Sequence, residues 1–217
     1  MNSSETKLNA HSKKGAGKIL ESPSIFNFWQ KITGAEEWKS RFMREYIKPF
    51  QDARILDVGC GTGSVLNYID KTINVDYVGC DINQDYIRQA GKKFGSKGTF
   101  YCCDVNALSE KESDFDIVIA IGIFHHLDDK SALTLVDSVK RKLKTGGAFF
   151  IAEPVRTENQ SRFEKYLMKN DRGKNIKAET GYLSMLKDFF SSVESKIVRD
   201  SHFIPWTVNV ITCKNSL

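Results

Sequence analysis

Three glycines, Gly59, Gly61 and Gly63, occupy alternate positions in the stretch LDVGCGTG, which continues the apolar run that begins at Ala53. Glycine has no Cβ, so a turn rich in glycine lets a ligand approach the backbone closely. The phosphate-binding pattern G-x-x-x-x-G-K-[ST] does not occur in the sequence. The dinucleotide pattern G-x-G-x-x-G starts with Gly59 and Gly61, but its third glycine would fall at Ser64. The glycines therefore predict a ligand site and leave the ligand open.

Three carboxylates are expected close to this turn. Asp57 lies in the apolar run before it, Asp81 ends a second run and Asp104 ends a third. A carboxylate at the end of the second strand can accept hydrogen bonds from a ribose diol, which nicotinamide sites also use. Three carboxylates around one crevice favour a cofactor with positive charge and amine donors, and they disfavour a pyrophosphate. S-adenosylmethionine, with a sulfonium, an ammonium, a ribose diol and an adenine amine, matches this set.

Groups able to move a proton follow the fourth and fifth apolar runs, FDIVIAIG and GAFFIAEP. They are His125, His126 and Glu153, and imidazole and carboxylate often serve as general bases. Adjacent histidines point in different directions, so at most one of them is expected to face an acceptor. Each group also has a structural interpretation: a histidine ring that packs against or caps the next helix, and Glu153 paired with an arginine such as Arg156.

Alternating strand-like and helix-like patterns predict the elements that position these residues. Strands are expected at 53–58, 74–81, 98–104, 115–122, 147–154, 193–200 and 206–213. Helices are expected at 64–71, from about Gln84 with Asn83 as its cap, and within 128–147. Repeated strand–helix units predict a parallel sheet with helices on both faces, and the last two strands predict an antiparallel hairpin at one edge. The predicted fold class is α/β, a three-layer sandwich with a mostly parallel seven-stranded sheet.

The chain is expected to form one domain over residues 19–217, after a polar and mobile tail of residues 1–18. Residues 19–50 carry two helical patterns and are predicted to form a helical lid. Residues 155–190 interrupt the sheet and are predicted to form an acceptor-side insertion. Both segments should lie near the carboxyl ends of the strands, where open α/β sheets bind ligands.

Five motifs in this order resemble the class I S-adenosylmethionine-dependent methyltransferases over most of residues 53–147. They are LDVGCGTG, VGCDIN, CCDVNAL, FDIVIAIGIFHHL and LKTGGAFF. The flanking stretches RFMREYIKPF, NDRGKN and IPWTVNV resemble a group of small, mostly uncharacterised bacterial methyltransferases. The resemblance implies a Rossmann-like fold and the cofactor S-adenosylmethionine.

The same resemblance assigns the cofactor contacts residue by residue. It places Asp81 on the ribose hydroxyls, Ile82 against the adenine, and Asp104 with the Val105 backbone at the adenine amine. The full set that it implies is Asp57, Gly59, Cys60, Gly61, Gly63, Asp81, Ile82, Asp104, Val105 and Ile121.

The amino-acid composition argues against membrane-spanning, metal-binding and nucleic-acid-binding proteins. An apolar content of 41%, no apolar run of membrane-spanning length and polar first residues predict a cytoplasmic globular protein without a membrane span. Five cysteines without ligand spacing predict reduced thiols and no metal site. The net charge of +5 is mild, and the basic run KRKLK (140–144) is interpreted as solvated surface, so a nucleic-acid partner is not favoured.

The sequence thus predicts transfer of a methyl group to an O, N or C nucleophile of a small-molecule acceptor, with His125, His126 and Glu153 as the catalytic candidates. A methyltransferase acting on RNA or protein remains an alternative. A nicotinamide-dependent oxidoreductase and a non-catalytic cofactor-binding protein are the alternatives from other classes. The acceptor and the oligomeric state are left open.

Overall fold

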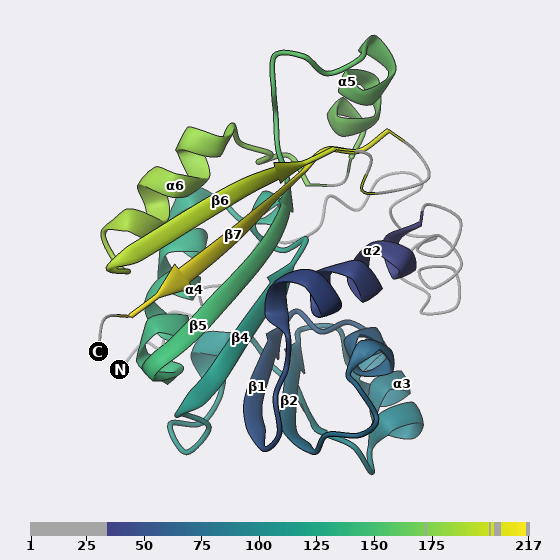
Figure 1. The fold of residues 1–217 in the computed structure, drawn as a ribbon, viewed down its shortest axis with the longest axis vertical. Helices are drawn as coiled ribbons and strands as arrows, with labels where there is room; N and C mark the ends of the chain where they lie inside the picture. Colours follow the sequence, from purple (N-terminus) through teal and green to yellow (C-terminus); the bar gives the residue numbers. More distant parts are fainter. Residues whose placement is uncertain (1–33, 172, 200, 202–204, 216–217) are drawn as a thin grey trace, which may run out of the picture.

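A seven-stranded sheet forms the centre of the computed structural model, which describes residues 34–171, 173–199, 201 and 205–215 (Figure 1). Its strand order is β3-β2-β1-β4-β5-β7-β6. The strands are β1 (Ala53–Val58), β2 (Val75–Asp81), β3 (Thr99–Cys102), β4 (Phe115–Ile121), β5 (Leu143–Pro154), β6 (Ser192–Val198) and β7 (Val208–Lys214). Strands β1 to β5 pair in parallel, and β7 runs antiparallel to both of its neighbours. The predicted mostly parallel sheet with an antiparallel edge hairpin is confirmed.

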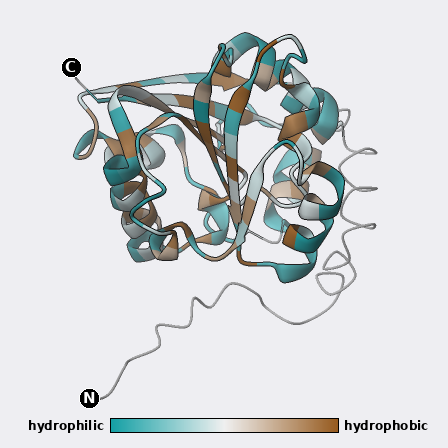
Figure 2. Cartoon of the chain, turned by 90° about the horizontal axis from the view of Figure 1, so that it is seen from below, coloured by the Kyte–Doolittle hydropathy of each residue, from teal (hydrophilic) through white to brown (hydrophobic). Residues whose placement is uncertain are grey.

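Helices cover both faces of this sheet, as Figure 2 shows. On one face lie α2 (Ala35–Phe42), the π-helical turn Met43–Ile47 that continues it, and α3 (Gln84–Phe94). On the other face lie α4 (Asp129–Lys142) and α6 (Glu179–Lys187), while α5 (Arg162–Lys169) projects beyond the sheet in Figure 1. Helix α2 is the second of the two helices expected within residues 19–50; the first falls outside the described residues. None of the helices described is long and apolar enough to cross a bilayer.

Local sequence signals explain where the helices start. Asn83 caps α3 by accepting hydrogen bonds from the backbone N–H groups of Asp85 and Tyr86, as predicted. Asp128 caps α4 through the N–H of Ser131. The stretch expected to be a helix at 64–71 is instead a 3₁₀-helix, Ser64–Tyr68, because the chain returns to an extended conformation at residue 69.

Alternate side chains of the central strands fill two hydrophobic cores, one on each face of the sheet. Leu56, Val118 and Phe149 belong to the core under α4 and α6. Ile55 and Ile117 belong to the core under α2 and α3. A strand buried on both faces reads as a continuous apolar run, which explains why β1, β4 and β5 were recognisable from the sequence.

The interpretation of the basic run 140–144 as solvated surface is wrong for Lys142. Its side chain is buried, and its ammonium donates to the backbone carbonyls of Leu108, Ser109 and Glu112 at 3.0, 3.2 and 3.3 Å. Position 142 is in the last turn of α4, on the side that faces the loop between β3 and β4. Lys142 therefore ties that loop to α4.

We expect Lys142→Met to lower the free energy of unfolding by about 1.5–3 kcal/mol, the usual contribution of buried hydrogen bonds to a charged group. Methionine keeps the apolar stem and removes the three donors. Urea denaturation followed by circular dichroism measures the change. The exposed neighbour Lys140→Met is the matched control and should change stability by less than about 0.5 kcal/mol; equal losses in the two variants would contradict the assigned role.

Candidate functional site

The glycine-rich loop after β1 is held against two neighbouring strand ends. The backbone N–H groups of Gly59 and Cys60 both donate to the carbonyl of Cys80, at 2.8 and 3.0 Å. Gly59 has a φ of 68°, and a Cβ at this position would overlap the side chain of Ile123 in the loop after β4. Only glycine meets both conditions without strain. The loop is thus fixed between the carboxyl ends of β2 and β4.

Asp81 and Ile82, at the end of β2, lie beside this loop. Asp81 is half-buried, and its two carboxylate oxygens accept hydrogen bonds from the N–H groups of Gly61 (2.9 Å) and Asn83 (2.8 Å). A carboxylate is an acceptor with two oxygens, a type of group that can accept from hydroxyls. Ile82 is 52% exposed, an unusual position for a large apolar side chain. A preoriented carboxylate next to an exposed apolar side chain fits a ribose diol followed by an adenine.

Asp104 and Val105 occupy the corresponding place after β3, which pairs with β2 in parallel. Asp104 is half-buried, and its Oδ1 accepts from the N–H of Asn106 at 2.8 Å. Val105 is buried, so only its backbone can serve a ligand. Ile121 ends β4 and is half-buried. The residues expected to contact the cofactor through the second, third and fourth motifs therefore lie at the carboxyl ends of β3, β2 and β4, with β1 between the last two; their contacts remain predictions.

Asp57 does not share this position. It is 2% exposed, and it accepts a hydrogen bond of 2.6 Å from the hydroxyl of Tyr77. Burial raises the pKa of Asp57 to about 7, with partial compensation by Tyr77 and by Lys39. Asp57 lies two residues after Ile55 on β1, so its side chain points to the same face of the sheet, which α2 covers. Asp57 therefore lies beneath the loop, whereas Asp81 and Asp104 lie at the carboxyl ends of β2 and β3; the contact of all three carboxylates with one ligand stays a prediction.

Lys39, which the sequence analysis did not identify, contacts the residue that follows the glycine-rich loop. Lys39 of α2 is buried, and its ammonium donates to Ser64 Oγ at 2.7 Å and to Glu36 at 3.3 Å. Burial lowers the pKa of Lys39, against the opposing influence of Glu36 and Asp57. Cys60, predicted in the cofactor set, turns its thiol into the same interior and is almost fully buried. Only the backbone of Cys60 therefore faces the loop surface.

Glu153, at the end of β5, holds the loop that follows β4. It is fully buried. Its Oε1 accepts from the N–H groups of Ile123 (2.6 Å) and Phe124 (2.8 Å). Its Oε2 accepts from the N–H of His125 (3.2 Å) and lies 2.7 Å from His125 Nδ1. The partner of Glu153 is thus His125 and its loop, whereas the structural interpretation from sequence had named an arginine such as Arg156.

A second carboxylate approaches His125 from the acceptor-side insertion. His125 Nε2 lies 3.4 Å from Asp171 Oδ1, and the N–H of Asn175 donates to the His125 carbonyl at 3.0 Å. A Cβ on Gly173 would overlap the imidazole ring, so glycine is required for this close approach. Asp171, Gly173 and Asn175 therefore cover His125. Sequence reasoning noticed the stretch NDRGKN and did not connect it to the histidines.

His126 has a different environment from His125. It is exposed, and the centroids of the two rings lie 4.0 Å apart at an interplanar angle of 40°. The two rings were predicted to point in different directions, whereas they lie against each other and differ in burial: His125 is enclosed by two carboxylates and Gly173, while His126 reaches the surface. Which group acts as a base remains a prediction.

Aromatic residues of the predicted lid and of the C-terminal part could also line an acceptor pocket, but those that the structure describes contribute less to the site. Tyr182 is buried, and its hydroxyl donates to the carbonyl of Pro154 at 3.0 Å, so it packs in the core under α6. Trp206 is half-buried. Phe26, Phe28 and Trp29 lie outside the described residues.

Comparisons with known proteins match this chain to a methyltransferase domain, over residues 55–147. The cyclopropane-fatty-acyl-phospholipid synthase of Escherichia coli is 27% identical over 121 residues, which cover 55% of this chain and 31% of that protein. Phosphoethanolamine N-methyltransferase 1 of Arabidopsis thaliana is 27% identical over 176 residues, which cover 78% of this chain and 35% of that protein. The chain thus spans about a third of the length of these relatives.

The fold also matches solved structures. Phosphoethanolamine N-methyltransferase 2 of Haemonchus contortus, solved with phosphomonomethylethanolamine and S-adenosylhomocysteine, superposes with a TM-score of 0.73 at 15% identity. The match covers 92% of this chain and 59% of that structure. At this identity the likeness concerns the fold, which is the Rossmann-like sandwich predicted from the motifs.

Proposed function

We propose that the chain, which matches a methyltransferase domain over residues 55–147, is a class I S-adenosylmethionine-dependent methyltransferase and methylates an O, N or C nucleophile of a small-molecule acceptor by in-line displacement. One observation carries the proposal: the carboxylate of Asp81, preoriented by Gly61 and Asn83, adjoins the exposed side chain of Ile82. The family supplies the cofactor, and the residues at the strand ends fit it.

The residues proposed to hold the cofactor lie at the carboxyl ends of β2 and β3. The carboxylate of Asp81 accepts from the ribose hydroxyls, and Ile82 packs against the adenine. Asp104 accepts from the adenine amine. When bound, the cofactor supplies a methyl group on a sulfonium, which a nucleophile can displace. Positioning of the acceptor in line with that methyl group and exclusion of water provide much of the rate in such a reaction.

On the acceptor side, we assign His126 as the general base and His125 as a positioning residue. His126 is the exposed member of the pair and can take a proton from an acceptor hydroxyl at a ring nitrogen. His125 is enclosed by Glu153, Asp171 and Gly173, so its contacts fix the loop that carries His126. An amine acceptor would need only to lose its proton before attack.

A small-molecule acceptor is the favoured class. The curated relatives are named for phosphoethanolamine and for fatty-acyl phospholipid. The sequence has no [DN]-P-P-[YF] at 120–123, a pattern of many adenine and glutamine N-methyltransferases. An RNA or protein acceptor is the second candidate, and the mild net charge of +5 gives it little support.

The acceptor class can be tested with tritiated S-adenosylmethionine and a cell lysate in which heating has inactivated the endogenous methyltransferases. After incubation with the protein, the lysate is separated into an organic extract, extracted RNA and acid-precipitated protein. The proposal expects the enzyme-dependent label in the organic or small-molecule fraction. Label confined to RNA or to protein would overturn the acceptor assignment and keep the cofactor assignment.

Binding of the cofactor is tested by calorimetric titration with S-adenosylhomocysteine. We expect Asp81→Ala to weaken binding by about 2–4 kcal/mol, or roughly 30- to 1,000-fold, because charge-assisted hydrogen bonds to both ribose hydroxyls are lost. Asp81→Asn retains one accepting oxygen and should lose less.

Asp76→Ala is the matched control, since Asp76 is an exposed aspartate on the same strand and pairs with Arg54 at 3.5 Å. Asp76→Ala should bind S-adenosylhomocysteine as the unmodified protein does. NADH should give no heat with the unmodified protein or with any of the three variants. Binding of NADH, or equal affinity in Asp81→Ala, would overturn the proposed site.

A further inference from the structure

Helix α5 exposes two large aromatic side chains on one face. Phe163 is 56% exposed and Tyr166 is 63% exposed. Residues three apart on a helix are neighbours, so the two rings form one patch. The other exposed large apolar side chains in the described part of the chain, Phe50, Ile82 and Leu133, belong to separate elements. Exposed apolar patches are typical of surfaces that bind a protein, a membrane or a ligand.

Three cations complete the exposed face of α5. Arg162, Lys165 and Lys169 are all exposed. With a rotation of about 100° per residue, the order around the helix is Lys165, Lys169, Arg162, Tyr166 and Phe163. The cations therefore occupy one side of the face and the aromatic rings occupy the other, with the tyrosine between the phenylalanine and the charges.

The single acidic residue of α5 is withdrawn from this face. Glu164 is buried, and its Oε1 accepts from Gln160 Nε2 at 3.0 Å. The same amide donates to the carbonyl of Val155 at 2.9 Å, and Met168 packs beside it. Residues 155–170 hold four Lys or Arg against two Glu, of which only Glu158 is exposed. The inner face thus fixes α5 to the end of β5, and the outer face is basic and aromatic.

We propose that the outer face of α5 docks on an anionic lipid bilayer. Aromatic side chains such as tyrosine favour the headgroup zone, and a helix with apolar residues on one side and Lys or Arg on the other lies in the plane of that zone. Each basic side chain near an anionic surface strengthens binding by roughly fivefold, which corresponds to about 1 kcal/mol. The position of α5, projecting beyond the sheet in Figure 1, leaves this face accessible.

Docking in this way brings the end of β5 close to the bilayer, because Gln160 links α5 to Val155, two residues after Glu153. The inference goes beyond the proposed methyl transfer and does not depend on it. A nucleic acid or an acidic protein would also attract the cations, but neither accounts as directly for a pair of aromatic rings beside them.

Flotation with vesicles tests the proposal on the full chain. Vesicles of equal parts phosphatidylcholine and phosphatidylglycerol are compared with vesicles of phosphatidylcholine alone. We expect the protein to float with the anionic vesicles and to remain behind with the neutral ones. Two variants should each show a partition coefficient onto the anionic vesicles that is at least tenfold lower. They are the triple variant Arg162→Gln, Lys165→Gln, Lys169→Gln and the double variant Phe163→Gln, Tyr166→Gln.

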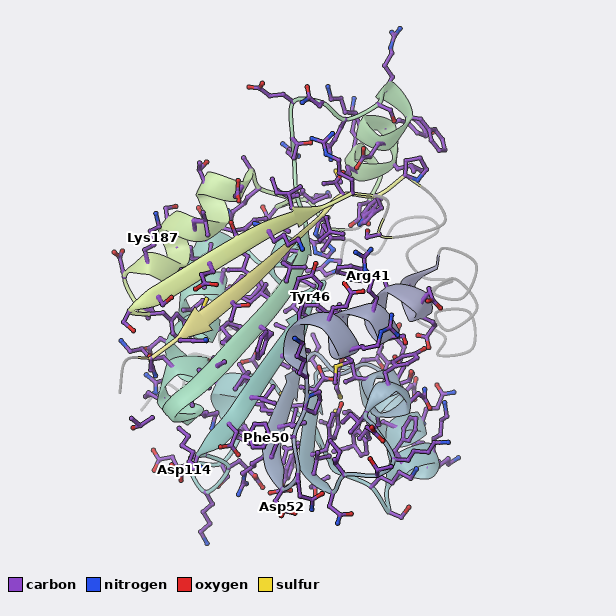
Figure 3. All side chains as sticks on the ribbon, viewed as in Figure 1. Arg41, Tyr46, Phe50, Asp52, Asp114 and Lys187 are labelled. Carbon is purple, nitrogen blue, oxygen red and sulfur yellow. The ribbon has the colours of Figure 1, made fainter. Side chains whose placement is uncertain are left out.

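The chain offers matched controls for both variants. Phe50→Gln removes an equally exposed phenylalanine far from α5 (Figure 3). The triple variant Lys92→Gln, Lys97→Gln, Lys187→Gln removes three exposed lysines from other surfaces. Each control should float as the unmodified protein does. Equal losses in the α5 variants and the controls, or equal flotation with neutral vesicles, would overturn the proposal.

Urea denaturation followed by circular dichroism checks the folding of every variant, and the single substitutions Phe163→Gln and Tyr166→Gln replace the double variant if it is unfolded. S-adenosylhomocysteine binding is measured separately. Protein that binds the nucleoside but does not float overturns the docking proposal alone. Protein that floats through α5 but binds no nucleoside overturns the proposed function alone. Retention of RNA or protein through α5 without flotation would also overturn the docking proposal.

Discussion

Replacing Glu153 with alanine is expected to lower the free energy of unfolding by about 3–5 kcal/mol. The carboxylate is fully buried and accepts from three backbone N–H groups, those of Ile123, Phe124 and His125, and from the His125 ring. Alanine leaves these buried donors without their acceptor, and removal of one partner of a buried charged network is among the most destabilising changes. Urea denaturation measures the loss.

Glu158→Ala is the matched control, since Glu158 is exposed on the connection that follows β5; it should change stability by less than about 0.5 kcal/mol. Glu153→Gln separates the structural from the catalytic role. The glutamine retains one accepting oxygen, so we expect intermediate stability and partial turnover. A Gln variant as stable as the unmodified protein but without turnover would make Glu153 a base, contrary to the positioning role.

Most of the sheet could be predicted because its strands carry their own signals. Parallel strands buried on both faces read as apolar runs, and β1 was predicted with its observed bounds, 53–58. The start of β5 was missed by four residues, since 143–146 contain Lys144, Thr145 and Gly146 and read as a helix end. Pairing of 143 with Phe115, before an irregularity in the β4–β5 register, extends the strand there.

The positions of site residues could be predicted from the sequence where the order of the strands alone brings them together. Asp81 and Asp104 end neighbouring parallel strands, so their proximity follows from strand order. Asp57 differs from both, because its side chain points to the face that α2 covers, where it accepts from the Tyr77 hydroxyl. Asp171 and Gly173 were missed because they reach His125 through a loop 46 to 48 residues away in sequence, and no periodic pattern marks such a contact.

The enclosure of His125 has a consequence for catalysis that His126→Ala tests. For a hydroxyl or carbon acceptor, we expect this variant to lower kcat by about 10²- to 10⁴-fold, the usual contribution of a general base. Stability should change by less than about 0.5 kcal/mol, because the His126 ring is exposed. Transfer of tritium from S-adenosylmethionine to the labelled small-molecule fraction measures the rate, and urea denaturation measures stability.

His125→Ala is the contrasting variant, and it should behave in the opposite way. Loss of the ring removes its contact with Glu153 and with Asp171, so stability falls, while S-adenosylhomocysteine binding through Asp81 persists. Added imidazole should restore part of the turnover of His126→Ala, since an exposed position can admit it, and none of that of His125→Ala. Unchanged turnover in His126→Ala, or rescue of His125→Ala instead, would transfer the base to another group. Under the proposed roles one loop serves two purposes: Glu153 fixes the backbone of Ile123, Phe124 and His125, and His126, the next residue, meets the acceptor.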